Sequence, residues 1–129
     1  MYLIDSSLWI EYFRPHGSKK VKDRLKEILR REEGCCCGVI VVEVLRGAKT
    51  EKDWNMLWEA LASLPRLPID EAVVERASKW GFMLDRKGKT ASTTDLLIAS
   101  AAHKNAKLIH IDSDFEMIAA ATGLDEERL

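Results

Sequence analysis

Two aspartates of this chain stand directly after short apolar runs, at positions where carboxylates can do chemistry. Asp5 follows Tyr2–Ile4, and Asp112 follows Leu108–Ile111, a run interrupted only by His110. Both runs predict short buried strands. Because ligands in open α/β sheets bind just beyond the carboxyl ends of the strands, we expect both carboxylates at a ligand-binding edge.

Two further acids occupy apolar surroundings. Glu43 is the single charged residue of Val39–Leu45, and Asp95 opens a helical pattern with an apolar face. Burying an unpaired carboxylate costs several kcal/mol. Taken singly, the four acids have ordinary structural explanations, as strand-end caps, helix-dipole partners, turn residues or, for Glu43, an ion pair with Arg46.

Taken together, the four acids predict a divalent metal site. Converging carboxylates repel one another unless a cation lies between them. Hard oxygen ligands suit Mg²⁺ or Mn²⁺, which take one or two carboxylates and fill their remaining positions with water and phosphate oxygens. We therefore expect these carboxylates to hold a divalent cation.

The first half of the chain must position Asp5 and Glu43. Ser6-Ser7 can cap a helix that runs to Phe13, and apolar residues recur at helical spacing over 21–29. The segment Cys35–Val42 is ambiguous, because its β-branched residues favour a strand whereas the residues from Gly38 onward allow a helix.

The second half of the chain must position Asp95 and Asp112. Leu67–Ile69 and 107–111 predict short strands, and 114–121 predicts a closing helix. Three further helices are expected to begin at polar caps, namely Thr50, Asp70 and either Thr93 or Thr94. Strands thus alternate with helices, which predicts one three-layer α/β/α domain over residues 1–129 with a mostly parallel central sheet.

Composition narrows the class of protein. At 129 residues, with 47% hydrophobic and 32% charged residues, the chain suits a globular domain with an ordinary core. No apolar run approaches the roughly 20 residues that span a bilayer, so we expect no membrane association. The first residues lack the pattern of a secretory signal. We expect a cytoplasmic protein.

The cysteines and three of the tryptophans are predicted to have structural rather than chemical roles. Cys35–Cys37 are consecutive, whereas zinc ligands are usually spaced C-x2-C or wider. They predict a buried strand without chemistry. Trp54, Trp58 and Trp80 recur at helical core spacing, which predicts a place in the core or in a subunit interface rather than base stacking.

The segments around the four acids resemble the PIN-domain family, especially the VapC-type toxins of bacteria and archaea. The matching segments, in family order and spread over essentially the whole chain, are Leu3–Phe13, Val42–Ala48, Thr94–Ala102 and Ile111–Phe115. Each segment is weakly specific alone, and four at compatible spacing make a fairly specific pattern. The resemblance implies the PIN fold and places Glu43 on a helix.

The resemblance also implies roles for individual residues. The catalytic acids it implies are Asp5, Glu43, Asp95 and Asp112. Of these, Asp5, Asp95 and Asp112 would be metal ligands, with Asp114 as a fifth carboxylate and Ser7 as a hydroxyl that lines the site. The family often has Thr two residues before the acid that matches Asp112, and here that residue is His110. A histidine on a strand is more often packed than catalytic, so we leave His110 outside the catalytic set.

The activity that the resemblance implies is Mg²⁺- or Mn²⁺-dependent endoribonuclease action on RNA phosphodiesters, leaving a 5′-phosphate and a 3′-hydroxyl. In such a reaction the metal lowers the pKa of a bound water and stabilises the leaving oxygen. The resemblance further implies the toxin of a toxin–antitoxin pair, inhibited by a cognate antitoxin protein and assembled as a homodimer. These partners are implied by analogy alone.

The formal net charge of -1 means that attraction to RNA must come from a local basic patch or from bound cations. The segment from Arg14 to Arg31 contains eight basic residues against two acidic ones. Lys19, Lys20 and Lys22 within it are candidate contacts to RNA phosphates or to an acidic partner. The ordinary alternative is a solvated helix face.

Two other functions fit parts of the pattern. A phosphoacceptor signalling domain also gathers acids at strand ends, but it needs a lysine beside the site and gives Glu43 no role. A catalytically silent PIN-like scaffold would bind RNA or protein without cutting. Retention of every acid in the pattern argues against the scaffold.

Overall fold

The computed structural model describes all residues from 1 to 129, and at its centre lies a five-stranded parallel sheet. The strands are β1 (Tyr2–Ile4), β2 (Gly34–Cys37), β3 (Arg66–Leu67), β4 (Lys107–His110) and β5 (Glu126–Arg128). Their order is β3-β2-β1-β4-β5, and every pair is parallel. The prediction of a mostly parallel sheet is confirmed. Parallel pairing places the carboxyl ends of β1 and β4 side by side, since Leu3 is in register with Leu108.

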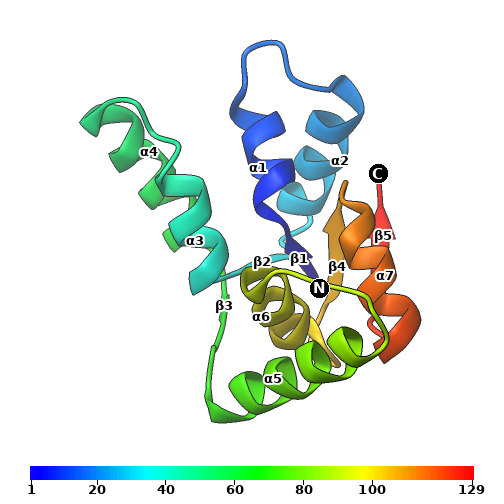
Figure 1. Cartoon of the computed structure of the whole chain (residues 1–129). Coiled ribbons are helices and arrows are strands. Elements are labelled where there is room, and N and C mark those ends of the chain that lie inside the picture. Colours follow the sequence, from blue (N-terminus) through cyan, green and yellow to red (C-terminus); the bar gives the residue numbers. More distant parts are fainter.

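Seven helices cover this sheet. They are α1 (Ser6–Phe13), α2 (Lys19–Arg30), α3 (Gly38–Leu45), α4 (Glu51–Ala62), α5 (Glu71–Arg86), α6 (Thr93–Ala102) and α7 (Ser113–Thr122). Figure 1 shows α1 and α2 on one side of the sheet, α6 and α7 on the other, and α3 and α4 projecting together beyond one edge. The predicted three-layer α/β/α arrangement is confirmed. No helix combines the length and apolar character needed to cross a membrane.

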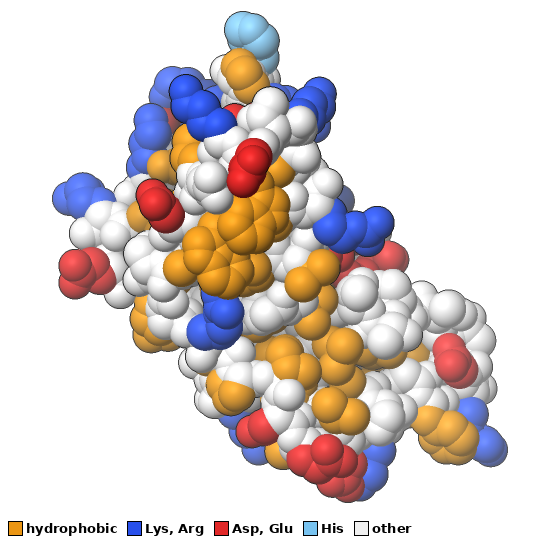
Figure 2. All heavy atoms as spheres, turned by 90° about the vertical axis from the view of Figure 1, so that its left-hand side faces the viewer, with side chains coloured by type: hydrophobic (Ala, Val, Ile, Leu, Met, Phe, Trp, Pro, Cys, Tyr) orange, Lys and Arg blue, Asp and Glu red, His pale blue; other side chains and the backbone are white.

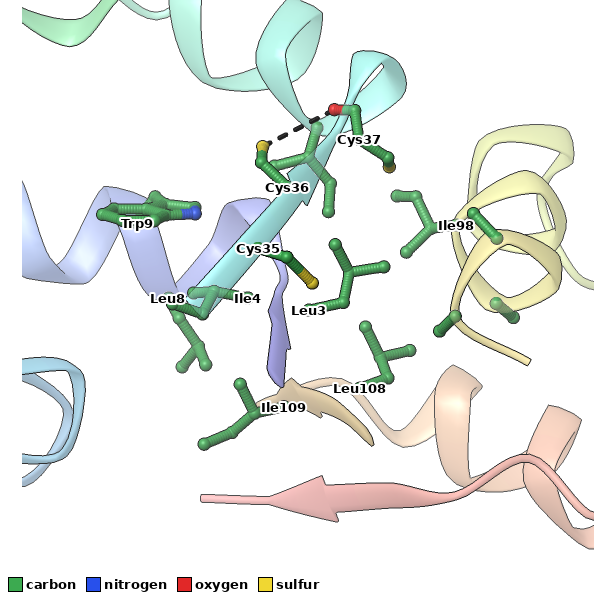
Figure 3. Packing of buried hydrophobic residues seen from close by; sticks show 14 of the residues in the cluster. Leu3, Ile4, Leu8, Trp9, Cys35, Cys36, Cys37, Ile98, Leu108 and Ile109 are labelled. Carbon is green, nitrogen blue, oxygen red and sulfur yellow. Dashed lines mark hydrogen bonds between the residues drawn. The ribbon is translucent and has the colours of Figure 1, made fainter. Parts of the chain in front are cut away.

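The core lies where the central strands meet α1 and α6. Leu3 and Ile4 of β1 and Leu108 and Ile109 of β4 are fully buried. Figure 3 shows Ile98 of α6 on the side of Leu3 and Leu108, with Ile4 and Ile109 on the other side of the strands. Alternate residues of a strand face opposite sides, so strands covered by helices on both faces read as continuous apolar runs. This explains why the two short runs beside Asp5 and Asp112 were visible in the sequence.

The three cysteines form most of β2 and are fully buried and unpaired. Figure 3 shows their side chains among the apolar residues of the core. Burial raises the pKa of Cys35 to about 11 and that of Cys36 to about 12. Because the thiolate is the reactive form, these thiols are inert at neutral pH, as expected of a buried strand.

Two predicted helix N-caps are wrong for the same reason. Asp5, rather than Ser6-Ser7, is the N-cap of α1, and Ser92, rather than Thr93 or Thr94, is the N-cap of α6. In both cases the residue that leaves the strand or loop accepts the hydrogen bond of a free helical N–H. The ambiguous segment divides at Gly38, where β2 gives way to α3. Strand β5 was not predicted, because Glu126–Arg128 is polar and has no apolar alternation.

The aromatic residues of α4 depart from the core interpretation. Leu57 and Leu61 are buried, whereas Trp54 and Trp58 are each 41% exposed and stack on one another with ring centroids 5.4 Å apart. Trp80 is partly buried and packs against the core. The core assignment of Trp54 and Trp58 is therefore wrong, and their assignment to a subunit interface remains a prediction.

Candidate active site

Asp5 lies at the carboxyl end of β1 and is 5% exposed. Its carboxylate Oδ2 accepts hydrogen bonds from the Ser7 backbone N–H at 3.2 Å and from the Ser7 hydroxyl at 2.5 Å. Burial raises the pKa of Asp5, and the two bonds from Ser7 oppose that rise. Ser7 thus contacts Asp5 directly.

Asp95 lies in the first turn of α6, and its backbone N–H donates to the Ser92 hydroxyl at 3.1 Å. Its carboxylate is half-buried. Burial raises the pKa of Asp95, and the negative charges of Asp5, Asp112 and Asp114 raise it further. The helix-dipole explanation holds for its position, but a carboxylate surrounded by other carboxylates gains more from a cation than from the helix end.

Asp112 and Asp114 lie at the start of α7, just beyond β4. Asp112 is the N-cap of the helix, and its Oδ1 accepts a hydrogen bond from the Asp114 N–H at 2.9 Å. Asp95, Asp112 and Asp114 each present a carboxylate oxygen within 4.8 Å of the others. The loop that follows β4 and the loop that precedes α6 therefore converge on one cluster. We call Asp95, Asp112 and Asp114 the acidic triad.

Glu43 projects from α3 with an oxygen, Oε1, that is buried and has no hydrogen-bond partner. The ion pair with Arg46, the ordinary alternative explanation of Glu43, is not formed. Burial raises the pKa of Glu43, and the charges of Asp5 and Asp95 raise it further. Asp5 and Glu43 are thus coupled electrostatically to Asp95, although their oxygens do not belong to the group that lies within 4.8 Å of one another.

These donors fit a hard divalent cation. The triad supplies three carboxylates at a spacing that one ion can bridge, and Glu43 supplies a buried oxygen that lacks a partner. A buried polar atom without a partner is costly and calls for an explanation such as a bound ion or water. Carboxylate oxygens are the ligands that Mg²⁺ and Mn²⁺ prefer.

The basic candidates do not join this cluster. Lys19 and Lys20 are exposed at the start of α2, and Lys22 is partly exposed. Lys19 pairs with Asp23 on the same helix, and Lys22 donates to the carbonyl of Arg14. The structure therefore brings together the five acids and Ser7 and leaves the three lysines on a separate surface.

Sequence reasoning overlooked two polar residues near the site. Ser92 caps the helix that carries Asp95, and the spacing Ser-x-x-Asp makes it a capping candidate beside Thr93 and Thr94. Glu126 on β5 contacts His110. No local signal could have revealed Glu126, because its partner lies 16 residues away across the sheet.

The raised pKa of Asp95 predicts how the metal-free chain responds to pH. An acid whose pKa is higher in the folded state binds more protons there, so its ionisation opposes folding as pH rises above the unfolded value of about 4. We expect Asp95→Asn to unfold at higher urea concentration than the native chain at pH 7.5 in chelator. The difference should shrink toward pH 4. A variant less stable than the native chain at pH 7.5 would contradict this.

Acids gathered at the carboxyl edge of a parallel α/β sheet define an acidic ligand-binding site, because ligands of open α/β sheets bind at this edge. Residues 2–121 match the family model for the PIN domain, and the chain belongs to this family. The chain is 36% identical over 129 residues to the VapC ribonuclease Mb1587 of Mycobacterium bovis, covering 96% of each protein. It is 25% identical to ribonuclease VapC18 of Mycobacterium tuberculosis, covering 98% of this chain and 93% of that protein.

Solved structures share the fold. VapBC2 from Rickettsia felis, bound to a promoter DNA fragment, matches with a TM-score of 0.81 and 19% identity over 99% of this chain and 98% of that one. VapBC-5 of Mycobacterium tuberculosis, a toxin-antitoxin system, matches with a TM-score of 0.72 and 21% identity over 98% and 97%. The family match favours a PIN domain over the phosphoacceptor alternative.

Proposed function

We propose that this chain is an endoribonuclease that hydrolyses RNA phosphodiesters with the help of Mg²⁺ or Mn²⁺ and acts as the toxin of a toxin–antitoxin pair. The observation that carries the proposal is the convergence of the acidic triad with the unpartnered Glu43 oxygen. Relatives named as VapC ribonucleases, 36% identical to this chain, support the same activity.

The residues of the site are proposed to have different roles. Asp95, Asp112 and Asp114 would hold the cation, and Asp5, whose orientation Ser7 fixes, would add a further carboxylate. When bound, the cation supplies positive charge that holds the scissile phosphate and stabilises the leaving oxygen. The raised pKa of Glu43 suits it to orient the attacking water and to accept a proton at Oε1.

The decisive experiment is cleavage of a panel of end-labelled RNAs by the purified chain. We expect cutting with Mg²⁺ or Mn²⁺ and none in chelator, with activity restored when the metal is returned. Products ending in a 5′-phosphate and a 3′-hydroxyl would match the proposed hydrolysis. If no RNA is cut while calorimetry detects no binding of either metal, the scaffold alternative replaces the nuclease.

We further propose an antitoxin protein as partner. Structural neighbours described as toxin-antitoxin complexes support this. An apolar groove of about 560 Å³ lies between α1, α3 and α4, with Trp9, Phe13 and Met56 among its lining residues. An apolar segment of the antitoxin would fill this groove.

The lysines at the start of α2 are proposed to bind RNA phosphates. Each phosphate that a lysine neutralises releases a counterion, so each such lysine steepens the dependence of log affinity on log salt by about 1. Replacing Lys19, Lys20 and Lys22 with Gln should therefore make this slope shallower by roughly 2 to 3. Filter binding at several salt concentrations measures the slope. A slope equal to that of the native chain would remove the lysines from the interface.

A homodimer is proposed through the exposed aromatic face of α4. Trp54 and Trp58, with Val42 of α3, line a small apolar hollow, and Figure 2 shows apolar side chains gathered on this side of the molecule. We expect light scattering to give about twice the monomer mass of 14.6 kDa. Replacing both tryptophans with Ala should give the monomer mass, and Phe82→Ala, exposed on α5, should not. A native chain that stays monomeric at all working concentrations contradicts the dimer.

A further inference from the structure

His110 of β4 is fully buried, yet both nitrogens of its ring make hydrogen bonds. Nε2 lies 2.5 Å from Oε2 of Glu126, and Nδ1 lies 3.0 Å from the backbone nitrogen of Asp112. The Phe115 ring packs against the imidazole at a centroid distance of 5.1 Å. The histidine therefore joins the last strand of the sheet to the loop that carries a metal-binding acid.

The bond to Asp112 determines which nitrogen carries the proton. A backbone N–H can only donate, so Nδ1 must accept through its lone pair. Nε2 then carries the hydrogen of the neutral ring and donates it to the Glu126 carboxylate. The hydrogen bonds run in one direction, from the Asp112 N–H through His110 to Glu126.

Two hydrogen bonds fix Asp112 in place. Its N–H is held by His110, and its Oδ1 accepts from the Asp114 N–H at 2.9 Å. The carboxylate keeps Oδ2 and the second lone pair of Oδ1 for a ligand, and one of its oxygens lies within 4.8 Å of oxygens from Asp95 and Asp114. Removing the His110 bond leaves the Asp112 N–H without its partner and frees the turn from β4 into α7.

The bond from Nδ1 to a backbone N–H two residues onward is local, and shorter side chains can copy it. Asn makes the same connection as an Asx turn, and Thr makes it more weakly through its hydroxyl. Neither side chain is long enough to make this bond and reach Glu126 as well. His110 thus combines a local turn contact with a long-range contact to Glu126 of β5. In addition, the N–H of Leu129, the residue after β5, donates to the His110 carbonyl at 2.9 Å.

We propose that His110 and Glu126 form a positioning pair that holds Asp112 in its metal-binding orientation and so makes the C-terminal strand part of the site. This proposal rests on the proposed metal-dependent function. His110 acts through Asp112 and does not itself touch metal or substrate, so it is a positioning residue. The contact to Glu126 fixes the orientation of the His110 ring, and the ring then fixes the turn from β4 into α7.

The first test measures Mn²⁺ affinity by calorimetry for the native chain and for His110→Leu, which is similar in size and lacks both hydrogen bonds. Loss of an outer-shell partner typically weakens metal binding about 10- to 100-fold, and we expect at least about 10-fold here. His110→Asn keeps the local acceptor and should recover most of that loss. Equal weakening by Leu and Asn would reduce His110 to a packing residue.

The contact to β5 is tested with a matched pair of variants. Glu126→Leu should weaken Mn²⁺ binding in the native background and have little further effect in the His110→Asn background. Glu127→Leu is the control, because Glu127 pairs with Arg24 on the opposite face of the same strand. Identical Mn²⁺ affinity in the native chain and in folded Glu126→Leu would overturn the role of Glu126.

A metal-free measurement separates this proposal from the proposed function. Nitrogen NMR of the ring should show the Nε2-protonated tautomer, and the Asp112 amide should be protected from exchange in the native chain and exposed in His110→Leu. If the native chain binds no Mn²⁺ while these signals appear as expected, the metal-dependent function fails and the hydrogen-bond network stands. If Mn²⁺ binds equally well to native chain and folded His110→Leu, only the positioning role fails.

Discussion

Replacing Asp95 with Asn is expected to lower kcat/KM for metal-dependent RNA cleavage by at least about 10³-fold. Burial raises the pKa of Asp95, and the negative charges of Asp5, Asp112 and Asp114 raise it further, so Asp95 is surrounded by the other acids of the site. A metal that stabilises transition-state charge contributes several kcal/mol, and each 1.36 kcal/mol is tenfold in rate. Asn has the size of Asp but only one weakly coordinating oxygen, so it removes this contribution without disturbing the packing.

The matched control is Asp85→Asn, an exposed position on α5 outside the acidic cluster. It should cleave RNA at the native rate. Both variants should be purified identically and assayed with Mn²⁺ under single-turnover conditions. Equal cleavage by the native chain and the Asp95 variant would show that the acidic triad is not the source of the activity.

Replacing Phe115 with Ala should destabilise the chain by about 3–5 kcal/mol, the usual cost of removing a buried aromatic side chain. Phe115 is 1% exposed, lies in the first turn of α7 and packs against His110. The loss is a large part of the 5–15 kcal/mol that stabilises a typical domain. Because the cavity would open beside His110, whose ring accepts the Asp112 N–H, we also expect weaker metal binding. Urea unfolding in chelator measures the change in stability.

Two controls define the Phe115 result. Phe115→Leu keeps most of the buried volume and should cost much less, whereas Phe82→Ala changes an aromatic residue that is 64% exposed on α5 and should have little effect. If Phe115→Ala unfolds at the native urea concentration, α7 does not depend on this contact for its position.

The sequence revealed the acids because their contexts are local. Apolar runs end at Asp5 and Asp112, and a charged residue interrupts the apolar segment around Glu43. These patterns follow from the two periodicities of strand and helix, which a single chain displays without any partner. They were sufficient to predict an alternating α/β fold and to select candidate ligands.

Local patterns could not assign the helix caps or the edge strand. Ser92 and Thr94 are both able to cap, and only the path of the loop decides that Ser92 accepts the Asp95 N–H. Strand β5 is polar because it lies at the edge of the sheet, where burial is incomplete. Its pairing with β4, rather than its own propensity, makes it a strand.

By itself the sequence determined the identity of the five carboxylates, the apolar strands beside them and the alternation that brings strand ends to one edge. Tertiary structure decided the rest, because distances between segments far apart in the chain depend on packing. It brought Asp95 within 4.8 Å of Asp112 and Asp114, and it left one oxygen of Glu43 buried without a partner. It also linked Glu126 to Asp112 through His110, since β4 and β5 become neighbours only when the sheet forms.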